Sequence, residues 1–403
     1  DLRNLKIAYI GGGSRGWART LMTDLAKDNE ICGTVFLYDI DFKAAEDNAM
    51  VGNRLSQRED IIGKWQYKAV KTIEEALIDA DFVVLSIQPA TLDEMESDVH
   101  LPEEYGIYQS VGDTVGPGGL VRALRTVPIY AQFAKDIEKY CPEAWIINFT
   151  NPMTVCVRTL YKVFPKIKAF GCCHEVFGTQ NFLSDVIEKE LGIKGVRREE
   201  IKVNVTGVNH YTWLTSAKYH NIDLFEVYKD YVAKRKDIGC PIKSDKNWMN
   251  NSFSSSQRVK FDLFRRYGAI AAAGDRHLAE FMPGDTYLRD PETVKSWKFG
   301  LTTVDWRKND LNERLKKSAE LDCKYAILGA GTNILAPDEG VAGLVICLKD
   351  CLDGITRLEG NRIRVGAGVT MTRAAVYAAG QNLGGMEFAH GIPGTVGGGV
   401  YMN

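Results

Sequence analysis

The sequence has no excess of charge of one sign and no long apolar run. Its 403 residues carry 50 Lys and Arg against 52 Asp and Glu, a net charge of −2. Proteins that bind nucleic acid or anionic membranes usually carry a basic excess, and a membrane-spanning helix needs roughly 20 apolar residues. The first residues also lack the charged and apolar regions of a signal peptide. We therefore expect no nucleic-acid partner and no membrane association.

Cysteine is sparse, with nine residues at irregular spacing and neither a C-x-x-C nor an H-E-x-x-H pattern. A disulfide framework would need a denser and even-numbered set, so we expect reduced thiols and a cytoplasmic protein. The composition, 45% apolar and 25% charged, is ordinary for a soluble globular protein and excludes collagenous and disordered classes. At ~150 residues per domain, the length fits two or three domains.

Apolar runs alternate with helical patterns over the first 175 residues. Four runs show no polar alternation, which is typical of parallel strands covered on both faces; they are residues 7–10, 35–38, 82–87 and 145–149. The alternation predicts an α/β fold, a Rossmann-like doubly wound dinucleotide-binding domain followed by a mixed α+β substrate domain. From about Leu321 short Gly- and Val-rich strands take over. We therefore expect three parts, at residues 1–175, 176–321 and 322–403.

A glycine-rich turn follows the first predicted strand. Gly11, Gly13 and Gly16 form G-x-G-x-x-G, whose glycines let a dinucleotide pyrophosphate approach the backbone at a helix N-terminus. Asp39 ends the second strand, 23 residues after Gly16, where a carboxylate accepts from ribose hydroxyls and repels a 2′-phosphate. The alternative is a merely structural turn, but strand, helix and acidic residue together favour NAD. The expected NAD-binding residues are Gly11, Gly13, Ser14, Arg15, Gly16 and Asp39.

Polar segments follow three further predicted strands, at residues 148–153, 171–175 and 207–210. Loops at the carboxyl ends of strands converge in an open α/β sheet, so a Cys and a His on two of them could share one divalent ion. The alternative is that the cysteines are small core residues and the histidine is hydrogen-bonded in the interior. The residues alone leave both interpretations open.

Two more segments combine small residues with charged ones. Residues 113–119 place an aspartate among glycines ahead of two arginines, which could bind a carboxylate or simply begin a basic helix. Residues 267–281 join a run of small residues to Asp-Arg-His-Leu-Ala-Glu, which predicts either a functional loop or a capped helix with a solvated face.

Taken together, these segments resemble glycoside hydrolase family 4, the NAD- and metal-dependent glycosidases. The resemblance runs in register from residue 5 to about residue 321, and its GCCHEVFG and GDRHLAEF stretches are most similar to the α-galacturonidase branch, which acts on pectin fragments. It is carried by GGGSRGW (11–17), SVGDTVGPGGLVRALRTVP (110–128), NFTNPM (148–153), GCCHEVFGTQ (171–180), GVNHYTW (207–213) and AAGDRHLAEFMP (272–283). The implied function is release of galacturonate from α-galacturonides by a homo-oligomeric enzyme.

The resemblance also implies an unusual mechanism. NAD⁺ takes a hydride from C3 of the sugar, a base removes the acidified C2 proton, and a divalent metal, usually Mn²⁺, acts as a Lewis acid. The C1 group is then eliminated, water adds and the hydride returns. Cys173 and His210 match the family's metal ligands. His174 is the candidate acid for the leaving group, and His277 is the candidate C2 base, with Tyr267 as the alternative.

Four residues are expected to contact the substrate. Asn151 matches the asparagine near C2 and C3, Asn209 stands beside the metal histidine, and Asp113 lies in the glycine-rich segment. Arg276 could pair with a uronate carboxylate, so the expected substrate is a uronic-acid oligosaccharide. The alternatives are an α-galactosidase, α-glucosidase or α-glucuronidase of the same family, or a lactate/malate-type dehydrogenase, since the Asn-Pro pair also resembles that family.

The C-terminal segment, residues 322–403, does not share this resemblance to glycosidases. Residues 325–335, 338–346, 365–370 and 385–403 are similar to part of the FAD domain of UDP-N-acetylenolpyruvoylglucosamine reductase. Only part of that domain is matched, so we expect neither FAD binding nor reductase activity. Family 4 chains ordinarily continue further, so we expect residues 176–321 to form an incomplete substrate domain and the C-terminal segment to be a fusion.

Overall fold

The computed structural model describes residues 2–241, 255–305, 325–328, 344–347, 352–392 and 394–402. The chain divides into two compact units, Asp1–Val304 and Asp305–Asn403, which are described separately. Among the described residues, no helix is both long and apolar enough to span a membrane.

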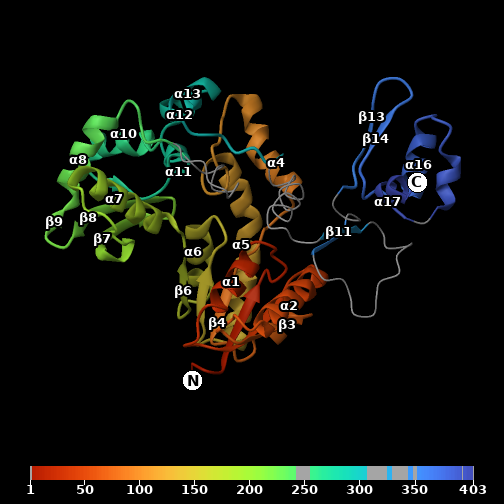
Figure 1. The fold of residues 1–403 in the computed structure, drawn as a ribbon, viewed down its shortest axis with the longest axis horizontal. Coiled ribbons are helices and arrows are strands. Elements are labelled where there is room, and N and C mark those ends of the chain that lie inside the picture. The colour runs from red at the N-terminus through yellow and green to blue at the C-terminus, as the bar shows by residue number, and fades with distance from the viewer. Residues whose placement is uncertain are drawn as a thin grey trace. The chain divides into compact units, whose positions relative to one another are not determined.

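A six-stranded parallel sheet forms the first half of the first unit (Figure 1). Its strand order is β3-β2-β1-β4-β5-β6, the order of a dinucleotide-binding doubly wound sheet, which confirms the predicted fold class. The strands are β1 (Leu5–Ile10), β2 (Gly33–Tyr38), β3 (Trp65–Val70), β4 (Phe82–Leu85), β5 (Trp145–Asn148) and β6 (Lys168–Gly171).

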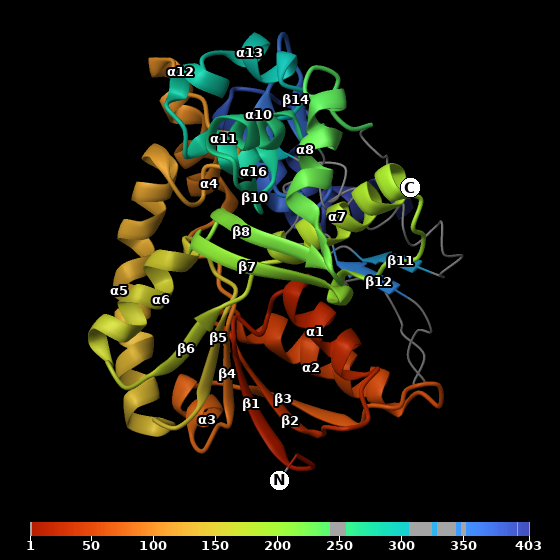
Figure 2. The same cartoon turned by 90° about the vertical axis from the view of Figure 1, so that its left-hand side faces the viewer.

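Helices cover both faces of this sheet, as the uniformly apolar strands require (Figure 2). Alternate residues of one strand face opposite sides, so Ile7 and Tyr9 pack with α1 and α2, whereas Ala8 and Ile10 pack with α3, α5 and α6. The helices are α1 (Trp17–Leu25), α2 (Phe42–Gln57), α3 (Ile73–Leu77), α4 (Leu92–His100), α5 (Gly116–Tyr140) and α6 (Met153–Val163), with a 3₁₀ turn at Leu101–Tyr105.

The second half of the first unit is built on a small antiparallel sheet with the order β10-β8-β7, and β9 pairs with β8. Its strands are β7 (Ile201–Val208), β8 (Tyr211–Tyr219), β9 (Ile222–Asp223) and β10 (Ile270–Ala271). The helices around it are α7 (Glu175–Leu191), α8 (Leu224–Arg235), α10 (Arg258–Tyr267), α11 (Asp275–Glu280), α12 (Gly284–Tyr287) and α13 (Pro291–Ser296), with a 3₁₀ turn at Arg198–Glu200.

The antiparallel sheet has a core of its own, in which aromatic residues of α8 and α10 meet the sheet and α7. Tyr228, Tyr231 and Phe261 are fully buried there. A neighbouring apolar cluster packs α10, α11 and α12 together around Leu263, Leu278 and other buried residues. These two clusters fix α11 against α10 and β10, which matters below because α11 carries polar side chains into the site.

The second unit contains two short described sheets. β11 (Tyr325–Leu328) and β12 (Leu344–Cys347) pair in parallel, and β13 (Ile355–Arg357) and β14 (Ile363–Val365) pair antiparallel. Two helices, α16 (Met371–Gly380) and α17 (Val396–Met402), and a 3₁₀ turn at Glu387–Gly391 follow. The Thr370 hydroxyl caps α16 by accepting a hydrogen bond from the Arg373 N–H.

Candidate active site

The glycine-rich turn between β1 and α1 leaves no room for side chains at the first two glycines of the G-x-G-x-x-G motif. A Cβ on Gly11, which has φ +95°, would lie 2.0 Å from the Ser86 carbonyl oxygen. A Cβ on Gly13 would lie 2.7 Å from the Ala44 Cβ. Gly16, in contrast, has no neighbour within 4 Å of that position. The first two glycines are therefore required by the packing of the turn itself.

The turn is held by carboxylate and amide side chains. Asp39 Oδ2 accepts the Gly13 N–H at 2.8 Å, and its Oδ1 accepts the Asp41 N–H at 3.0 Å. Asn48, which is fully buried, donates from Nδ2 to the carbonyl oxygens of Gly12 and Ser14 at 2.8 and 2.9 Å. The spacing of the glycines indicates the turn, but Asn48 lies inside α2 and carries no sequence signal for this role.

Ser14 and Arg15 lie at the entrance to α1. The Ser14 hydroxyl accepts the N–H of Trp17, the first residue of α1, at 3.1 Å, and Arg15 is exposed. The carboxylate of Asp39 has further lone pairs beyond the two it uses within the turn. The glycine turn and the N-terminus of α1 thus offer N–H groups for a pyrophosphate, and Asp39 offers a carboxylate for a ribose hydroxyl, as a dinucleotide requires.

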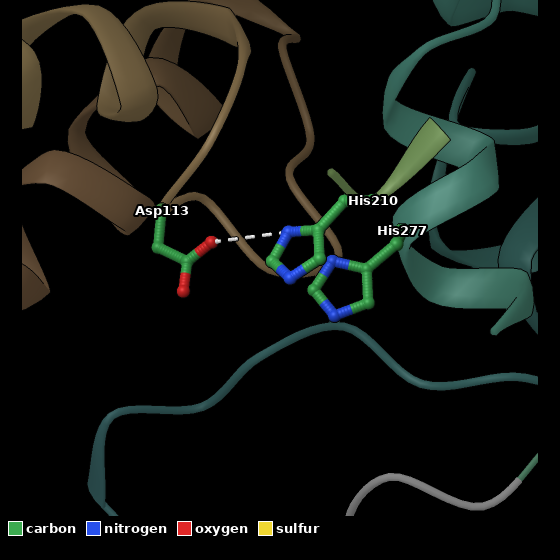
Figure 3. Close-up of side chains that lie close together, drawn as sticks. All are labelled: Asp113, His210 and His277. Carbon is green, nitrogen blue, oxygen red and sulfur yellow. Dashed lines mark ion pairs between the residues drawn. The ribbon is translucent and has the colours of Figure 1, made fainter. Parts of the chain in front are cut away.

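A second group of polar side chains gathers from four separate places in the fold, and Figure 3 shows three of its members, Asp113, His210 and His277. Cys173 lies between β6 and α7, and Glu175 is the first residue of α7. His210 lies at the tip of the β7–β8 hairpin, where a φ of +66° turns the chain. Asp113 precedes α5, and His277 projects from α11. These residues form two sets of three, and within each set one potential ligand atom per residue lies within 4.8 Å of the other two. The sets are Asp113–His210–His277 and Cys173–Glu175–His210.

His210 has a defined proton arrangement. The Thr114 hydroxyl donates to Asp113 Oδ1 at 2.7 Å, because a carboxylate only accepts. The same hydroxyl lies 2.7 Å from His210 Nδ1, so it accepts the Nδ1–H. His210 Nε2 therefore keeps its lone pair, as a metal ligand requires. The ring also contacts His277, with the centroids 3.6 Å apart and the ring planes tilted by 30°.

Burial sets the charges of this cluster. It lowers the pKa of His210 and, together with the neighbouring His210 ring, holds the pKa of His277 well below its ordinary value. Both imidazoles are therefore neutral near pH 7. Burial also raises the pKa of the Cys173 thiol to about 11 and that of Glu175 to about 7, against the opposing charge of Lys260.

Several buried polar atoms of the cluster have no hydrogen-bond partner among the described residues. They are Oε1 and Oε2 of Glu175, Nδ1 of His277, and Oδ1 of both Asn151 and Asn209. Buried polar groups are normally paired, so each such atom calls for a ligand or water. Asn151 Nδ2 donates to Asp113 Oδ2 at 3.0 Å, whereas its Oδ1 has no partner among the described residues. Thiol, imidazole and unpaired oxygens together fit a divalent cation and a polyhydroxylated molecule.

α11 fixes the loop that carries Asp113. Glu280 Oε1 accepts the Val111 and Gly112 N–H groups at 2.6 and 2.7 Å. The Arg276 guanidinium donates from Nε and one Nη to the Ser110 carbonyl oxygen, at 3.1 and 2.6 Å, and also to the Thr302 hydroxyl. The structure therefore places Arg276, which we expected at a substrate carboxylate, on the protein backbone.

The remaining predicted residues lie around the cluster. His174 is exposed and immediately follows Cys173, and Asn209 immediately precedes His210. Tyr267, at the end of α10, is 58% exposed and contacts the Trp213 ring. It is not in either set of potential ligand atoms, whereas His277 is. Sequence reasoning gave no role to Thr114, Glu175, Lys260 or Glu280, although all of them except Lys260 lay within quoted segments.

Comparison with known proteins gives three matching family models. The model for "Family 4 glycosyl hydrolase" matches residues 6–189, and the model for the C-terminal domain of the same family matches residues 205–341. A model for an FAD binding domain matches residues 307–403.

Individual relatives agree with these models. An α-galacturonidase of Thermoanaerobacterium saccharolyticum is 64% identical over 320 residues, which cover 79% of this chain and 69% of the relative. The crystal structure of lplD from Bacillus subtilis is 54% identical, with a TM-score of 0.73 over 80% of this chain and 72% of that one. A 6-phospho-β-glucosidase of Thermotoga maritima, solved with manganese, NAD⁺ and glucose-6-phosphate, shares the fold at 22% identity and a TM-score of 0.55, over 79% of this chain and 66% of that one.

Proposed function

The chain belongs to the family 4 glycosyl hydrolases, and we propose that it releases galacturonate from α-galacturonides, with NAD⁺ and a divalent metal such as Mn²⁺ as cofactors. The observation that carries this proposal is the cluster in which potential ligand atoms of Cys173, Glu175 and His210 lie within 4.8 Å of one another. Around it, Asn151, which donates to Asp113, and Asn209, which precedes His210, each have a buried oxygen without a partner among the described residues. The 64% identical relative is an α-galacturonidase, which supports the choice of sugar.

The dinucleotide would be held at the β1–α1 turn. NAD⁺ would supply a hydride acceptor for C3 of the sugar. The glycine turn and the N-terminus of α1 would bind its pyrophosphate, since their N–H groups attract anions. Asp39 would accept from a ribose hydroxyl with the lone pairs that Gly13 and Asp41 leave free, and its charge would disfavour a 2′-phosphate.

The metal would be held by Cys173 and His210. A divalent ion there would supply Lewis-acid polarisation of the sugar oxygens. His210 is prepared for this role because Thr114 accepts its Nδ1–H and so leaves Nε2 free. The Cys173 thiol must lose its proton to bind, and a dication next to it would favour the thiolate.

The chain's own acid and base groups would move the protons. His277 is neutral because burial lowers its pKa, so it can accept the C2 proton. Asn151 and Asn209 would bind the hydroxyls near C2 and C3, and His174, exposed beside Cys173, would donate a proton to the leaving group. Arg276 would contribute indirectly, by holding the loop that carries Asp113.

The test is galacturonate release from a digalacturonide under reducing conditions, with NAD⁺ and Mn²⁺, against a chelator control. We expect release that requires both cofactors and gives no net NADH, because the hydride returns in each turnover. Parallel assays on α-galactosides, α-glucosides and α-glucuronides establish the sugar. Faster release from one of these, or net NADH production from a hydroxy acid, would overturn the proposal.

A further inference from the structure

Glu175 is a buried carboxyl group that the proposed chemistry does not use. Its side chain is 4% exposed, and neither of its oxygens has a hydrogen-bond partner among the described residues. The nearby buried cation, Lys260, donates to the Thr179 hydroxyl at 3.0 Å instead. A buried carboxyl group with both oxygens unpaired is costly unless something else binds it.

The geometry places this carboxyl group at the metal site. One oxygen of Glu175, Cys173 Sγ and a His210 nitrogen all lie within 4.8 Å of one another. Atoms bound to one ion at ~2.0–2.3 Å are separated by roughly 3–4.6 Å, so the three can share an ion after small side-chain shifts. Cys173 and Glu175 are separated by a single residue, at the point where the β6 loop enters α7.

Asp113 belongs to the other set of potential ligands, but its oxygens are already used. Oδ1 accepts from Thr114 and Oδ2 accepts from Asn151. Glu175 has no such partners in the described part of the chain. Each carboxyl group has one imidazole nitrogen 3.9 Å away, so Glu175 differs from Asp113 in that neither of its oxygens accepts a hydrogen bond among the described residues.

We propose that Glu175 is a third protein ligand of the divalent ion held by Cys173 and His210. This inference rests on the metal site of the proposed function and adds a ligand to it. A thiolate and an imidazole alone suit Zn²⁺ and other softer ions, whereas a carboxylate oxygen suits Mn²⁺. The thiolate and carboxylate charges together also balance a dication in a buried site.

The test compares Mn²⁺ and Co²⁺ binding to the full chain without substrate. Wild type, Glu175→Gln, Cys173→Ser and the matched control Glu188→Gln, an exposed residue of the same helix, are titrated with Mn²⁺, and free Mn²⁺ is followed by electron paramagnetic resonance. Circular dichroism and NAD⁺ affinity report whether each variant is folded. We expect Glu175→Gln to weaken Mn²⁺ binding at least roughly tenfold and the control to leave it unchanged.

The Co²⁺ spectrum separates a ligand from a neighbour of the ligands. Loss of a carboxylate ligand changes the d–d bands, while the thiolate-to-cobalt band from Cys173 remains. Weaker binding with unchanged d–d bands would make Glu175 a neighbour only and overturn the inference. Wild-type affinity in Glu175→Gln, with weak binding in Cys173→Ser, would overturn it and leave the proposed function intact. No Mn²⁺ binding by wild type would overturn both.

Discussion

Glu280 makes the stability of the first unit depend on pH. Burial raises the pKa of this carboxyl group from near 4.5 to about 8, against the opposing effect of the Val111 and Gly112 N–H groups that it accepts. Between these two values the folded chain binds one more proton than the unfolded chain. The free energy of unfolding therefore falls as pH rises, by up to about 1.4 kcal/mol per pH unit, and levels off above about pH 8.

Glu280→Gln removes this dependence. The glutamine is neutral at every pH, and its carbonyl oxygen can still accept the two N–H groups that Glu280 Oε1 accepts at 2.6 and 2.7 Å. The stability of the variant relative to wild type should therefore increase from pH 5 to pH 8. The ceiling is roughly 5 kcal/mol, the equivalent of a shift from 4.5 to about 8.

The assay is urea unfolding of the full chain, followed by circular dichroism at each pH unit from 5 to 9. Subtracting wild type from variant cancels the other titrating groups, and Glu188→Gln controls for loss of an exposed carboxylate on α7. A stability difference that is the same at pH 5.5 and 8.5, or that falls with pH, would refute the reasoning. Either result would mean that Glu280 is ionised in the folded state.

The remaining predictions concern the NAD turn and the C2 base. Gly13→Ala should destabilise the chain in the absence of NAD by about 1–3 kcal/mol, because the new Cβ would lie 2.7 Å from the Ala44 methyl group. Gly16→Ala should have no such effect, because nothing lies within 4 Å of its Cβ position. Thermal unfolding measures both variants, and equal effects would contradict the packing argument. His277→Asn should slow the exchange of solvent deuterium into C2 of the bound sugar by about 10²–10⁴-fold, because it removes the proposed base. Tyr267→Phe should have little effect, and the reverse pattern would assign the base to Tyr267.

The parallel sheet and its glycine turn could be predicted because their signals are local. Uniformly apolar runs identify strands buried on both faces, and glycine spacing identifies a turn that cannot accommodate side chains. The structure confirms the resulting α/β fold, and its parallel sheet also contains β3, which was not among the predicted runs and alternates between buried and exposed residues. Asn48 could not be predicted, because it reaches Gly12 and Ser14 from inside a helix with no special pattern.

The polar cluster could be predicted only in part. Cys173 follows β6 of the parallel sheet, so the rule about strand ends places it near the crevice. His210 lies in a hairpin of the antiparallel sheet, where that rule does not apply, so only the family resemblance validly pointed to it. The contact between Thr114 and His210 joins residues 96 positions apart, and no spacing rule predicts it. The same limit applies to Lys260, since its sequence context is an amphipathic helix in which a lysine would ordinarily reach solvent.

Arg276 shows most clearly why residue type alone does not give a role. A guanidinium beside a candidate base is equally suited to a substrate carboxylate and to a backbone carbonyl. The structure resolves this through helix periodicity. Arg276 and Glu280 are four residues apart and so lie on one face of α11, and both bind the 110–112 loop. His277, one residue on from Arg276, points instead toward His210. The loop carrying Asp113 and the ring of His277 are thus fixed by the same short helix, so a change that moves one must move the other.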